Sequence, residues 1–440
     1  MDTVHLIVSG RYLVDVVEGS FSENISVAIA GDTIVEIASG LDKKYPEAEH
    51  LNTPHGLIMP GLINTHTHAA MSCFRGLADD LPLMEWLQEH IFPVEAKLTK
   101  DMVYQSTLLS ICEMIKSGTT TFNDMYLFAG DVARATAESG MRAWLGEVLY
   151  DFPSPNYGEL ANGFVYTNEL IAAYADDPLI SITVNPHAVY TCSPELLCQL
   201  GDQSAQHNTL YHIHLAETRD EVNTCKERYG TTPVQHLYNL GLLNNRVVAA
   251  HCVMVDDDDQ DLLAENEVNV AHCAESNMKL ASGTAPVVNM SKKGIVIGIG
   301  TDGSASNNDV DMFAEMNSVA KIHKIAHMDP TVMDAASTLY AATLGGAKLL
   351  GADKYIGSIE VGKKADLLVL DMDQPHLTPV YNPLSHVVYA ARGSDVVHTV
   401  INGRIVMNNR NLTFLDERQI IADMTRLGCT VRGLSRLEAR

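Results

Sequence analysis

The segment Ile58–His68, "IMPGLINTHTH", decides how the fold of this chain is interpreted. An apolar run pauses at Pro60-Gly61, continues for three residues, and ends on two histidines separated by a single residue. In an extended strand, side chains i and i+2 point to the same side. The imidazoles of His66 and His68 would therefore face one point in space, which suits a metal ion. A pair of hydrogen-bonded histidines at a strand end is the alternative, and the motif alone leaves both open.

The middle of the chain repeats one unit, an apolar strand followed by a helix-like segment. After the opening strand, seven further apolar segments occur at residues 119–124, 142–149, 180–187, 210–217, 246–252, 267–276 and 294–303. Strands that are apolar throughout and alternate with helices are typical of a parallel sheet buried on both faces. Eight such units predict an α/β fold of the (β/α)₈ TIM-barrel type. A doubly wound sheet is the alternative, although no Gly-rich phosphate loop follows the first strand.

Both ends of the chain have a different texture, with short strands broken by Gly or Asp. Examples are "HLIVSGRYLV" at residues 5–14 and "GSIEVGKKADLLVLDM" at residues 357–372. We expect a small composite β-sandwich from residues 1–56 and 352–410, a metal-dependent barrel over 57–351, and a helical C-terminal tail over 411–440.

Composition excludes several classes of partner. The chain has 440 residues, of which 55 are acidic and 30 are basic, so its formal charge is −25. Such a surface repels nucleic acid and anionic membranes, and we expect neither as a partner. Eight scattered cysteines without a Cys-x-x-Cys pair, and an N-terminus without a signal-peptide pattern, predict a cytoplasmic protein with free thiols. It would act on a small molecule and could form a homo-oligomer.

Polar residues gather where the predicted strands end. In a (β/α)₈ barrel the active site lies at the C-terminal ends of the strands. Those ends carry His66, His68, Asn123, Asp124, Glu147, His187, His214, Glu217, His251, His272 and Asp302. Core packing does not require ionisable residues at nearly every strand end. Nitrogen and oxygen ligands without sulfur suit Zn²⁺, with Fe²⁺ or Mn²⁺ as rivals and one position left for water.

Several longer motifs resemble a known family: "PGLINTHTHAAM", "HIHLAET", "AAHCVMV", "ESNMKLASG" and "GIGTDGSASNN". Together they resemble the amidohydrolase superfamily and, more closely, the 5-methylthioadenosine/S-adenosylhomocysteine deaminases, from about Gly10 to Asn409. The resemblance implies one divalent metal per chain, bound by His66, His68, His214 and Asp302. Some superfamily members bridge two metals through a carboxylated lysine at the end of the fourth strand. This chain has His187 there and no lysine, which argues for a single metal.

The resemblance also implies a reaction. The expected activity is hydrolytic deamination of an adenosine-type nucleoside (5-methylthioadenosine, S-adenosylhomocysteine or adenosine) to the inosine derivative and ammonia, by metal-bound hydroxide attacking C6. A metal lowers the pKa of its bound water from about 15.7 to roughly 7. Asp302 would accept the water's proton, His251 would hydrogen-bond the same water, and Glu217 would protonate the ring nitrogen and then the departing ammonia.

Each of these residues has a structural alternative. Glu217 could be a surface carboxylate, His251 a satisfied core histidine, and Asp302 a helix N-cap. His272 we expect to be structural. For the whole chain, the alternative activity is hydrolysis of another amino-heteroaromatic ring, such as a guanine-like base or a triazine. A catalytically inactive assembly protein is a further alternative, but it predicts lost ligands, and all four are present.

Contacts to the substrate follow from the resemblance. Glu95 would accept hydrogen bonds from the ribose 2′- and 3′-hydroxyls, because its two oxygens suit a vicinal diol. A diol-free base would give it no partner, so Glu95 separates the alternative substrates. Trp86 would line the pocket or anchor a loop, and His187 would contact the sugar or its 5′-substituent. Glu217 and Asp302 would also contact the substrate.

Recognition of S-adenosylhomocysteine requires a cation for its carboxylate, usually an arginine. Between Arg142 and Arg219 the chain has neither lysine nor arginine. We therefore expect a neutral 5′-substituent to be preferred, unless Arg75, Arg142, Arg219 or a neighbouring subunit supplies the cation.

Overall fold

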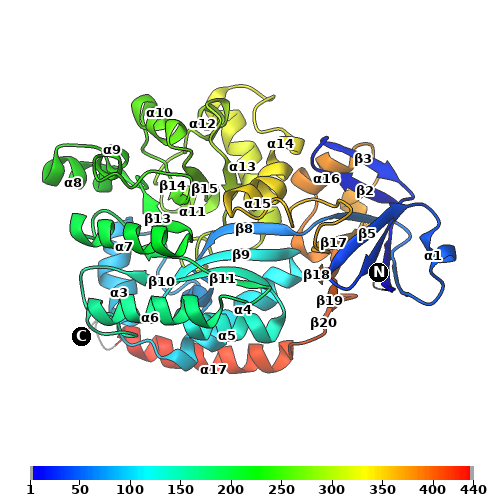
Figure 1. Ribbon diagram of the computed structural model, residues 1–440, viewed down its shortest axis with the longest axis horizontal. Coiled ribbons are helices and arrows are strands. Elements are labelled where there is room, and N and C mark those ends of the chain that lie inside the picture. The colour runs from blue at the N-terminus through cyan, green and yellow to red at the C-terminus, as the bar shows by residue number, and fades with distance from the viewer. Residues whose placement is uncertain (1–2, 437–440) are drawn as a thin grey trace.

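The computed structural model describes residues 3–436 and has two parts (Figure 1). A barrel with helices around it forms the larger part, and strands from both ends of the chain form a sandwich beside it, drawn in blue and orange at the right. The predicted fold class, a (β/α)₈ barrel with a β-sandwich built from the chain ends, is confirmed.

Parallel strands form the barrel. They are β8 (Leu62–Thr67), β9 (Thr119–Tyr126), β10 (Arg142–Leu149), β11 (Ile180–Ile182), β12 (Asn185–Pro186), β13 (Tyr211–Leu215), β14 (Val247–His251), β15 (Asn269–His272) and β16 (Ile297–Ile299). The predicted segment 180–187 is divided into β11 and β12, both of which pair with β10. Parallel bridges such as Val184 with Tyr211 join the two halves of the barrel. The barrel closes where the Asp302 backbone amide donates to the His66 carbonyl at 3.0 Å.

Helices alternate with these strands and cover their outer face. They are α4 (Lys100–Lys116), α5 (Ala129–Ser139), α6 (Leu160–Ala173), α7 (Pro194–His207), α8 (Arg219–Tyr229), α9 (Pro233–Asn239), α10 (Asp257–Glu265), α11 (Ala274–Lys279), α12 (Val287–Lys292), α13 (Met312–His327), α14 (Ala335–Tyr340) and α15 (Gly346–Leu349). Several begin at a side-chain N-cap: Thr99 starts α4, Ser193 starts α7 and Thr218 starts α8. Each cap oxygen accepts a backbone N–H that would otherwise lack a partner.

A separate insertion follows β8 and covers the open end of the barrel. It contains a 3₁₀ segment (Ala69–Phe74), α2 (Leu83–Glu85), a π-helical segment (Trp86–Ile91) and α3 (Phe92–Glu95). This insertion carries two of the residues predicted to contact substrate, Trp86 and Glu95.

Two sheets make up the sandwich. One has the order β20-β19-β18-β17-β7-β2-β3 and the other β5-β4-β1-β6. Their bounds are β1 Val4–Ser9, β2 Tyr12–Asp15, β3 Ser20–Glu23, β4 Ser26–Ala30, β5 Thr33–Ala38, β6 Glu49–Asn52, β7 Gly56–Pro60, β17 Leu367–Asp371, β18 Val396–Ile401, β19 Arg404–Asn408 and β20 Asn411–Leu412, with α1 (Leu41–Lys44) and α16 (Pro383–Tyr389) beside them. Antiparallel pairing of β7 with β17 joins the two chain ends. Ile29, Ile58 and Val369 belong to the apolar cluster that the strands bury.

Pro60 and Gly61, where the apolar run is interrupted, form the boundary between the sandwich and the barrel. Strand β7 pairs within the sandwich, and β8 begins the barrel directly after Gly61, so this boundary lies later than the predicted limit at residue 57. A Cβ atom at Gly61 would lie 2.0 Å from Thr120 Oγ1, so no side chain fits there.

The C-terminal tail ends in α17 (Glu417–Arg436), drawn in red along the lower edge beside α4 (Figure 1). The last four residues of the predicted tail, 437–440, lie outside the described residues.

Gly300 provides a test of how closely β8 and β16 must approach. A Cβ atom there would lie 2.7 Å from the His66 backbone nitrogen, so Gly300→Ala should force the two segments apart. Overpacking of this kind typically costs about 1–3 kcal/mol. We expect a lower free energy of unfolding and less bound metal, measured by denaturant unfolding and elemental analysis.

Gly428→Ala, within α17, is the matched control. Its added Cβ would meet no atom of the described residues within 4 Å, and Ala is favoured over Gly in a helix interior by roughly 0.8–1 kcal/mol. This variant should be more stable than the parent. Equal stability of both glycine variants would contradict the close-approach explanation.

Candidate active site

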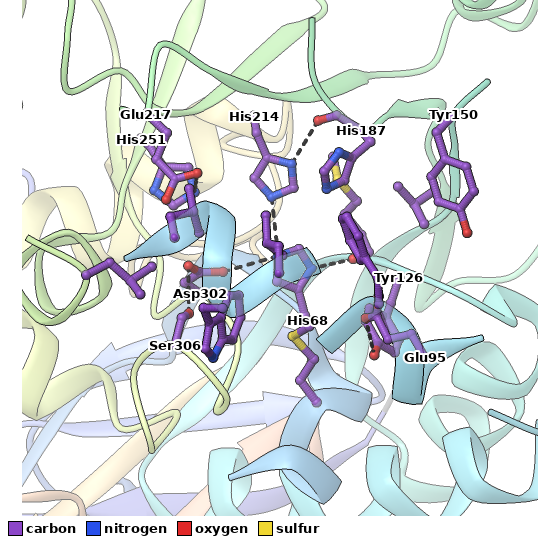
Figure 2. Close-up of a pocket in the computed structure, with 18 of the residues that line it drawn as sticks. His68, Glu95, Tyr126, Tyr150, His187, His214, Glu217, His251, Asp302 and Ser306 are labelled. Carbon is purple, nitrogen blue, oxygen red and sulfur yellow. Dashed lines mark hydrogen bonds and ion pairs between the residues drawn. The ribbon is translucent and has the colours of Figure 1, made fainter. Parts of the chain in front are cut away.

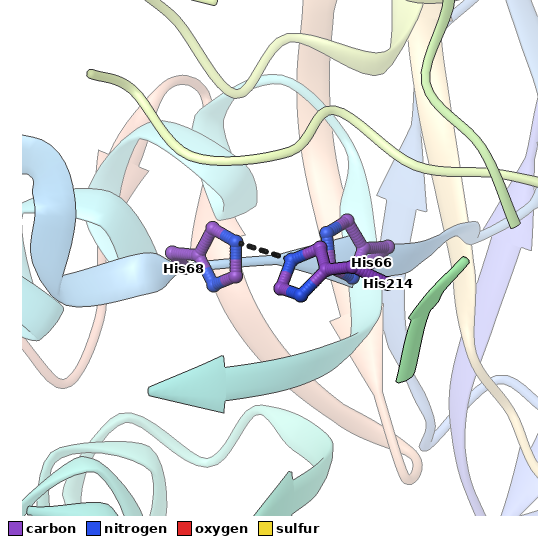
Figure 3. Close-up of side chains that lie close together, drawn as sticks. All are labelled: His66, His68 and His214. Atoms are coloured by element: carbon purple, nitrogen blue, oxygen red, sulfur yellow. Dashed lines mark hydrogen bonds between the residues drawn. The ribbon is translucent and has the colours of Figure 1, made fainter. Parts of the chain in front are cut away.

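Four predicted metal ligands meet at the C-terminal end of the barrel. The ligand atoms of His66, His68 and His214 all lie within 4.8 Å of one another, and Figure 3 shows their rings converging. His68 Nε2 lies 3.3 Å from His214 Nε2 and 3.1 Å from Asp302 Oδ1. Two ligands of a tetrahedral zinc with bonds of 2.0–2.1 Å are roughly 3.3 Å apart. His66 Nε2 is buried without a hydrogen-bond partner in the described structure, so the donor set fits a metal.

The remaining ring nitrogen of each histidine ligand is also held. His68 Nδ1 contacts the Met125 carbonyl, and His214 Nδ1 lies 2.8 Å from the His187 carbonyl. These backbone acceptors fix the proton on Nδ1 and leave Nε2 free to bind a metal. His66 differs from the other two, because its Nδ1 contacts a side chain instead of a carbonyl.

Asp302 is held as an ionised carboxylate. Its Oδ2 accepts hydrogen bonds from Ser276 Oγ at 2.6 Å and Ser306 Oγ at 2.9 Å. Burial alone would raise the pKa of this carboxyl, but the facing ring nitrogens of His66 and His68, at 3.5 and 3.1 Å, outweigh burial and hold the pKa well below its usual range. Its backbone has φ 59°, a left-handed conformation that is uncommon without glycine and is often found at functional sites.

Glu217 and His251 lie together beside the ligands. His251 Nε2 is 3.9 Å from Glu217 Oε2, while its Nδ1 is 2.9 Å from Asn277 Oδ1. Burial raises the pKa of Glu217, which is only 5% exposed, so the surface-carboxylate alternative is wrong. His251 also lies within ligand distance of His66 and Asp302. The Nδ1 atom of His251 therefore has a hydrogen-bond partner, as expected of a core histidine, while its Nε2 atom faces the site.

Glu221 positions Glu217. Its carboxylate accepts the backbone amides of Ala216 at 3.0 Å and Glu217 at 2.8 Å, which fixes the turn after β13. Thr218 then caps α8 by accepting from the Glu221 amide. The tight turn explains how a residue three positions beyond His214 returns to the same cavity.

One cavity contains all of the predicted substrate contacts (Figure 2). In this view Glu217 and His251 lie on one side, Glu95 and Tyr126 on the other, with His68 and His214 between them. Glu95 Oε1 accepts a hydrogen bond from Tyr126 Oη at 2.7 Å. For Glu95 Oε2, no hydrogen bond is found among the described residues.

Trp86 and His187 complete the predicted lining. The Trp86 indole N–H donates to the Ala78 carbonyl at 3.1 Å, so this residue both anchors its loop and lines the cavity. His187 Nδ1 contacts Thr191 Oγ1 at 2.8 Å, and burial lowers the pKa of His187 to about 3. His187 faces the cavity but belongs to neither of the two ligand groups around His66.

Other strand-end residues do not line the cavity. Glu147 accepts from the Ala129 amide at 2.8 Å and from Asn156 Nδ2 at 3.0 Å, and burial raises the pKa of Glu147 to about 8. Asp124, Asn123 and His272 are likewise absent from the lining and bond within the barrel; His272 Nε2, for example, lies 3.0 Å from His323 Nε2.

The arginines considered as partners for the S-adenosylhomocysteine carboxylate lie away from this cavity. Arg142 forms a buried salt bridge with Asp366 at 2.7 Å, and Arg75 pairs with Glu113. Neither they nor Arg219 line the cavity.

Sequence reasoning missed a second hollow that adjoins the first. It shares Phe92, Glu95, Tyr150 and Tyr190 with the metal-side cavity and extends to Asp220, Thr224 and Arg228 on α8. These three positions are four residues apart, the spacing of one helix face, and that spacing is the signal that could have found them.

A model of the amidohydrolase family matches residues 57–406. This chain is a member of the amidohydrolase family. It is 51% identical over 429 residues to a 5-methylthioadenosine/S-adenosylhomocysteine deaminase of Syntrophobacter fumaroxidans, covering 97% of this chain and 98% of that protein. It is 43% identical over 405 residues to a 5′-deoxyadenosine deaminase of Methanosarcina acetivorans, covering 91% and 92%. The predicted family is therefore confirmed.

A solved relative provides the structural comparison. An adenosine deaminase from Xanthomonas campestris with bound zinc superposes with a TM-score of 0.96 at 38% identity, over 98% of this chain and 99% of that one. Within residues 3–436 of this amidohydrolase, no helix has the length and apolar character needed to cross a membrane.

The ligand geometry predicts one zinc per chain. Elemental analysis of purified protein should find one equivalent, and Asp302→Ala should lower this content because it removes an anionic ligand from a buried site. Two equivalents per chain, or none after expression with added zinc, would contradict the single-metal site.

Proposed function

We propose that this amidohydrolase hydrolytically deaminates adenosine-type nucleosides, releasing ammonia and the inosine derivative. The observation that carries the proposal is a single cavity that holds the cluster of possible metal ligands together with the buried carboxyl groups of Glu217 and Glu95. The names of the relatives, which are deaminases of adenosine derivatives, support the same substrate class.

Metal chemistry and side-chain chemistry have separate tasks. A zinc held by His66, His68, His214 and Asp302 would supply Lewis-acid activation of water at neutral pH. Asp302, ionised and adjacent, would be the base that takes up a proton from the attacking water. His251 presents Nε2 toward the same point because Asn277 holds its other nitrogen. Burial raises the pKa of Glu217 and so favours its protonated form, from which a proton would pass to the ring nitrogen beside C6.

Recognition of the sugar falls to Glu95. Tyr126 donates to one carboxylate oxygen, which leaves the other oxygen and the remaining lone pairs for two ribose hydroxyls. A substrate without a diol would bury this carboxylate without those donors, which costs free energy. Glu95 therefore favours nucleosides over free bases and triazines.

Replacing Glu217 tests the proposed proton transfer. Glu217→Gln preserves size but removes the proton, so we expect deamination to fall about 10²–10⁴-fold with metal content unchanged. Ammonia release measured with adenosine and 5-methylthioadenosine gives the result. Glu147→Gln is the matched control, since Glu147 is another buried carboxylate near a strand end but lies outside the cavity. Activity within tenfold of the parent in the Glu217 variant would contradict this role.

The surfaces near the cavity bear on which 5′-substituent the site prefers. Tyr150 and Phe152 stack with ring centroids 3.8 Å apart beside Phe92, an aromatic surface suited to a neutral 5′-methylthio group. Beyond them, α8 presents Asp220 and Arg228, charges of opposite sign that could pair with an amino-acid ammonium and carboxylate. We propose that Arg228 supplies the cation that the sequence between Arg142 and Arg219 lacks.

Arg228→Gln tests this pairing. A hydrogen bond to a charged group contributes about 1.5–3 kcal/mol, so kcat/KM for S-adenosylhomocysteine should fall roughly ten- to a hundredfold. The kcat/KM for 5-methylthioadenosine should stay unchanged. Arg219→Gln, on the same helix but outside the second hollow, should affect neither substrate. If Arg228→Gln leaves S-adenosylhomocysteine unaffected, this cation does not reach the substrate, and the neutral 5′-substituent remains the expected preference.

A further inference from the structure

The three histidine ligands are supported in two different ways. His68 and His214 each place the second ring nitrogen against a backbone carbonyl, which the strands themselves position. His66 places its Nδ1 2.9 Å from Nε2 of His212, a side chain. The orientation of His66 is therefore the one that a side-chain substitution can disturb without touching any ligand.

His212 is well placed for this contact. It precedes His214 by two residues on β13, so both side chains point to the same side of the strand, one deeper in the barrel than the other. The His212 ring is fully buried, and its plane is nearly perpendicular to that of His66, at 88° with centroids 4.9 Å apart. One strand thus supplies a metal ligand and the support for another ligand.

Proton positions follow from the chemistry of binding. A metal at Nε2 of His66 needs the lone pair of that atom, which puts the ring proton on Nδ1 and makes His212 Nε2 its acceptor. The proton of His212 then lies on Nδ1, which is 3.2 Å from Asn123 Nδ2. Turning the Asn123 amide would offer this proton Oδ1, an atom without a partner in the described structure, in exchange for the hydrogen bond at 2.9 Å from Asn123 Nδ2 to the Thr65 carbonyl.

We propose that His212 is a positioning residue for the metal: it accepts the Nδ1 proton of His66 and so holds His66 Nε2 toward the ion. The proposal rests on the metal site described above but not on the identity of the substrate. Removing a residue that hydrogen-bonds a metal ligand typically lowers metal affinity about 10–100-fold. A histidine that merely fills the barrel interior would contribute to folding stability but not to metal affinity.

Two substitutions separate these roles. In His212→Gln the side-chain amide reaches about as far as Nε2, so an acceptor for His66 is retained. In His212→Asn the amide reaches only about as far as Nδ1, so the contact with His66 is lost while a polar group remains beside Asn123. Zinc affinity would be measured by chelator competition, ligand geometry by the absorption spectrum of the cobalt(II)-substituted protein, and folding by thermal unfolding.

We expect His212→Asn to bind zinc about 10–100-fold more weakly than the parent and to show an altered cobalt(II) spectrum. His212→Gln should bind zinc within a few-fold of the parent, with a parent-like spectrum. His236→Asn is the control, because His236 is a buried histidine stacked on Tyr229 and lies outside the cavity lining. It should leave zinc affinity unchanged whatever its effect on stability.

Unchanged zinc affinity in His212→Asn, or an equal loss in both variants, would overturn the proposal. If His212→Asn does not fold, a tenfold or larger loss in folded His212→Gln is enough to overturn it. Neither measurement requires turnover, so a failure of the proposed deamination would be seen separately, as a chain that binds zinc normally and releases no ammonia.

Discussion

The close contact between β8 and the chain at the end of β16, called the seam below, is the constraint on which the site depends. Here the Asp302 amide donates to the His66 carbonyl, and Gly300 approaches the His66 backbone so closely that a Cβ atom would not fit. Asn64 and Thr301 add two further buried hydrogen bonds across the same seam. Closing the barrel and bringing the anionic ligand to the histidines are therefore one structural event. The metal-binding geometry follows from backbone contacts that cannot relax independently of the fold.

Beside this contact, burial and hydrogen bonding shift the pKa values of two buried carboxyl groups in opposite directions. Asp302 receives hydrogen bonds from Ser276 and Ser306 and lies against the ring nitrogens of His66 and His68, so its pKa stays low. Glu217 is equally buried, no hydrogen bond to its carboxylate is found among residues 3–436, and burial raises its pKa. Environments that separate the pKa values of neighbouring acids assign them the roles of base and acid. The opposite shifts therefore support the proposed roles of Asp302 as base and Glu217 as acid.

The sequence predicted the fold because period and composition determine it. Buried parallel strands are apolar throughout, so all eight segments could be found, and the residues that the family resemblance implies as ligands stand at their ends. It could not predict which strand-end side chains turn inward: Glu147 bonds to Ala129 and Asn156 instead of facing the cavity. It also missed His212 and Arg228, because neither stands at a strand end. Finding them required the depth of a residue along β13 and the facing side of α8, which only tertiary packing defines.

Helix α8 connects Glu217 to the second hollow. It begins at Thr218, immediately after Glu217, and Glu221 in its first turn fixes the Glu217 backbone through two amide hydrogen bonds. Two turns further on, the same helix carries Arg228, whose guanidinium also donates to the Tyr190 carbonyl at 3.3 Å. A substrate tail that pairs with Arg228 would bind the same helix that positions Glu217, the proposed proton donor. Contacts far from C6 could then influence the chemical step, because binding energy from a remote part of a substrate can be used to orient the reacting groups.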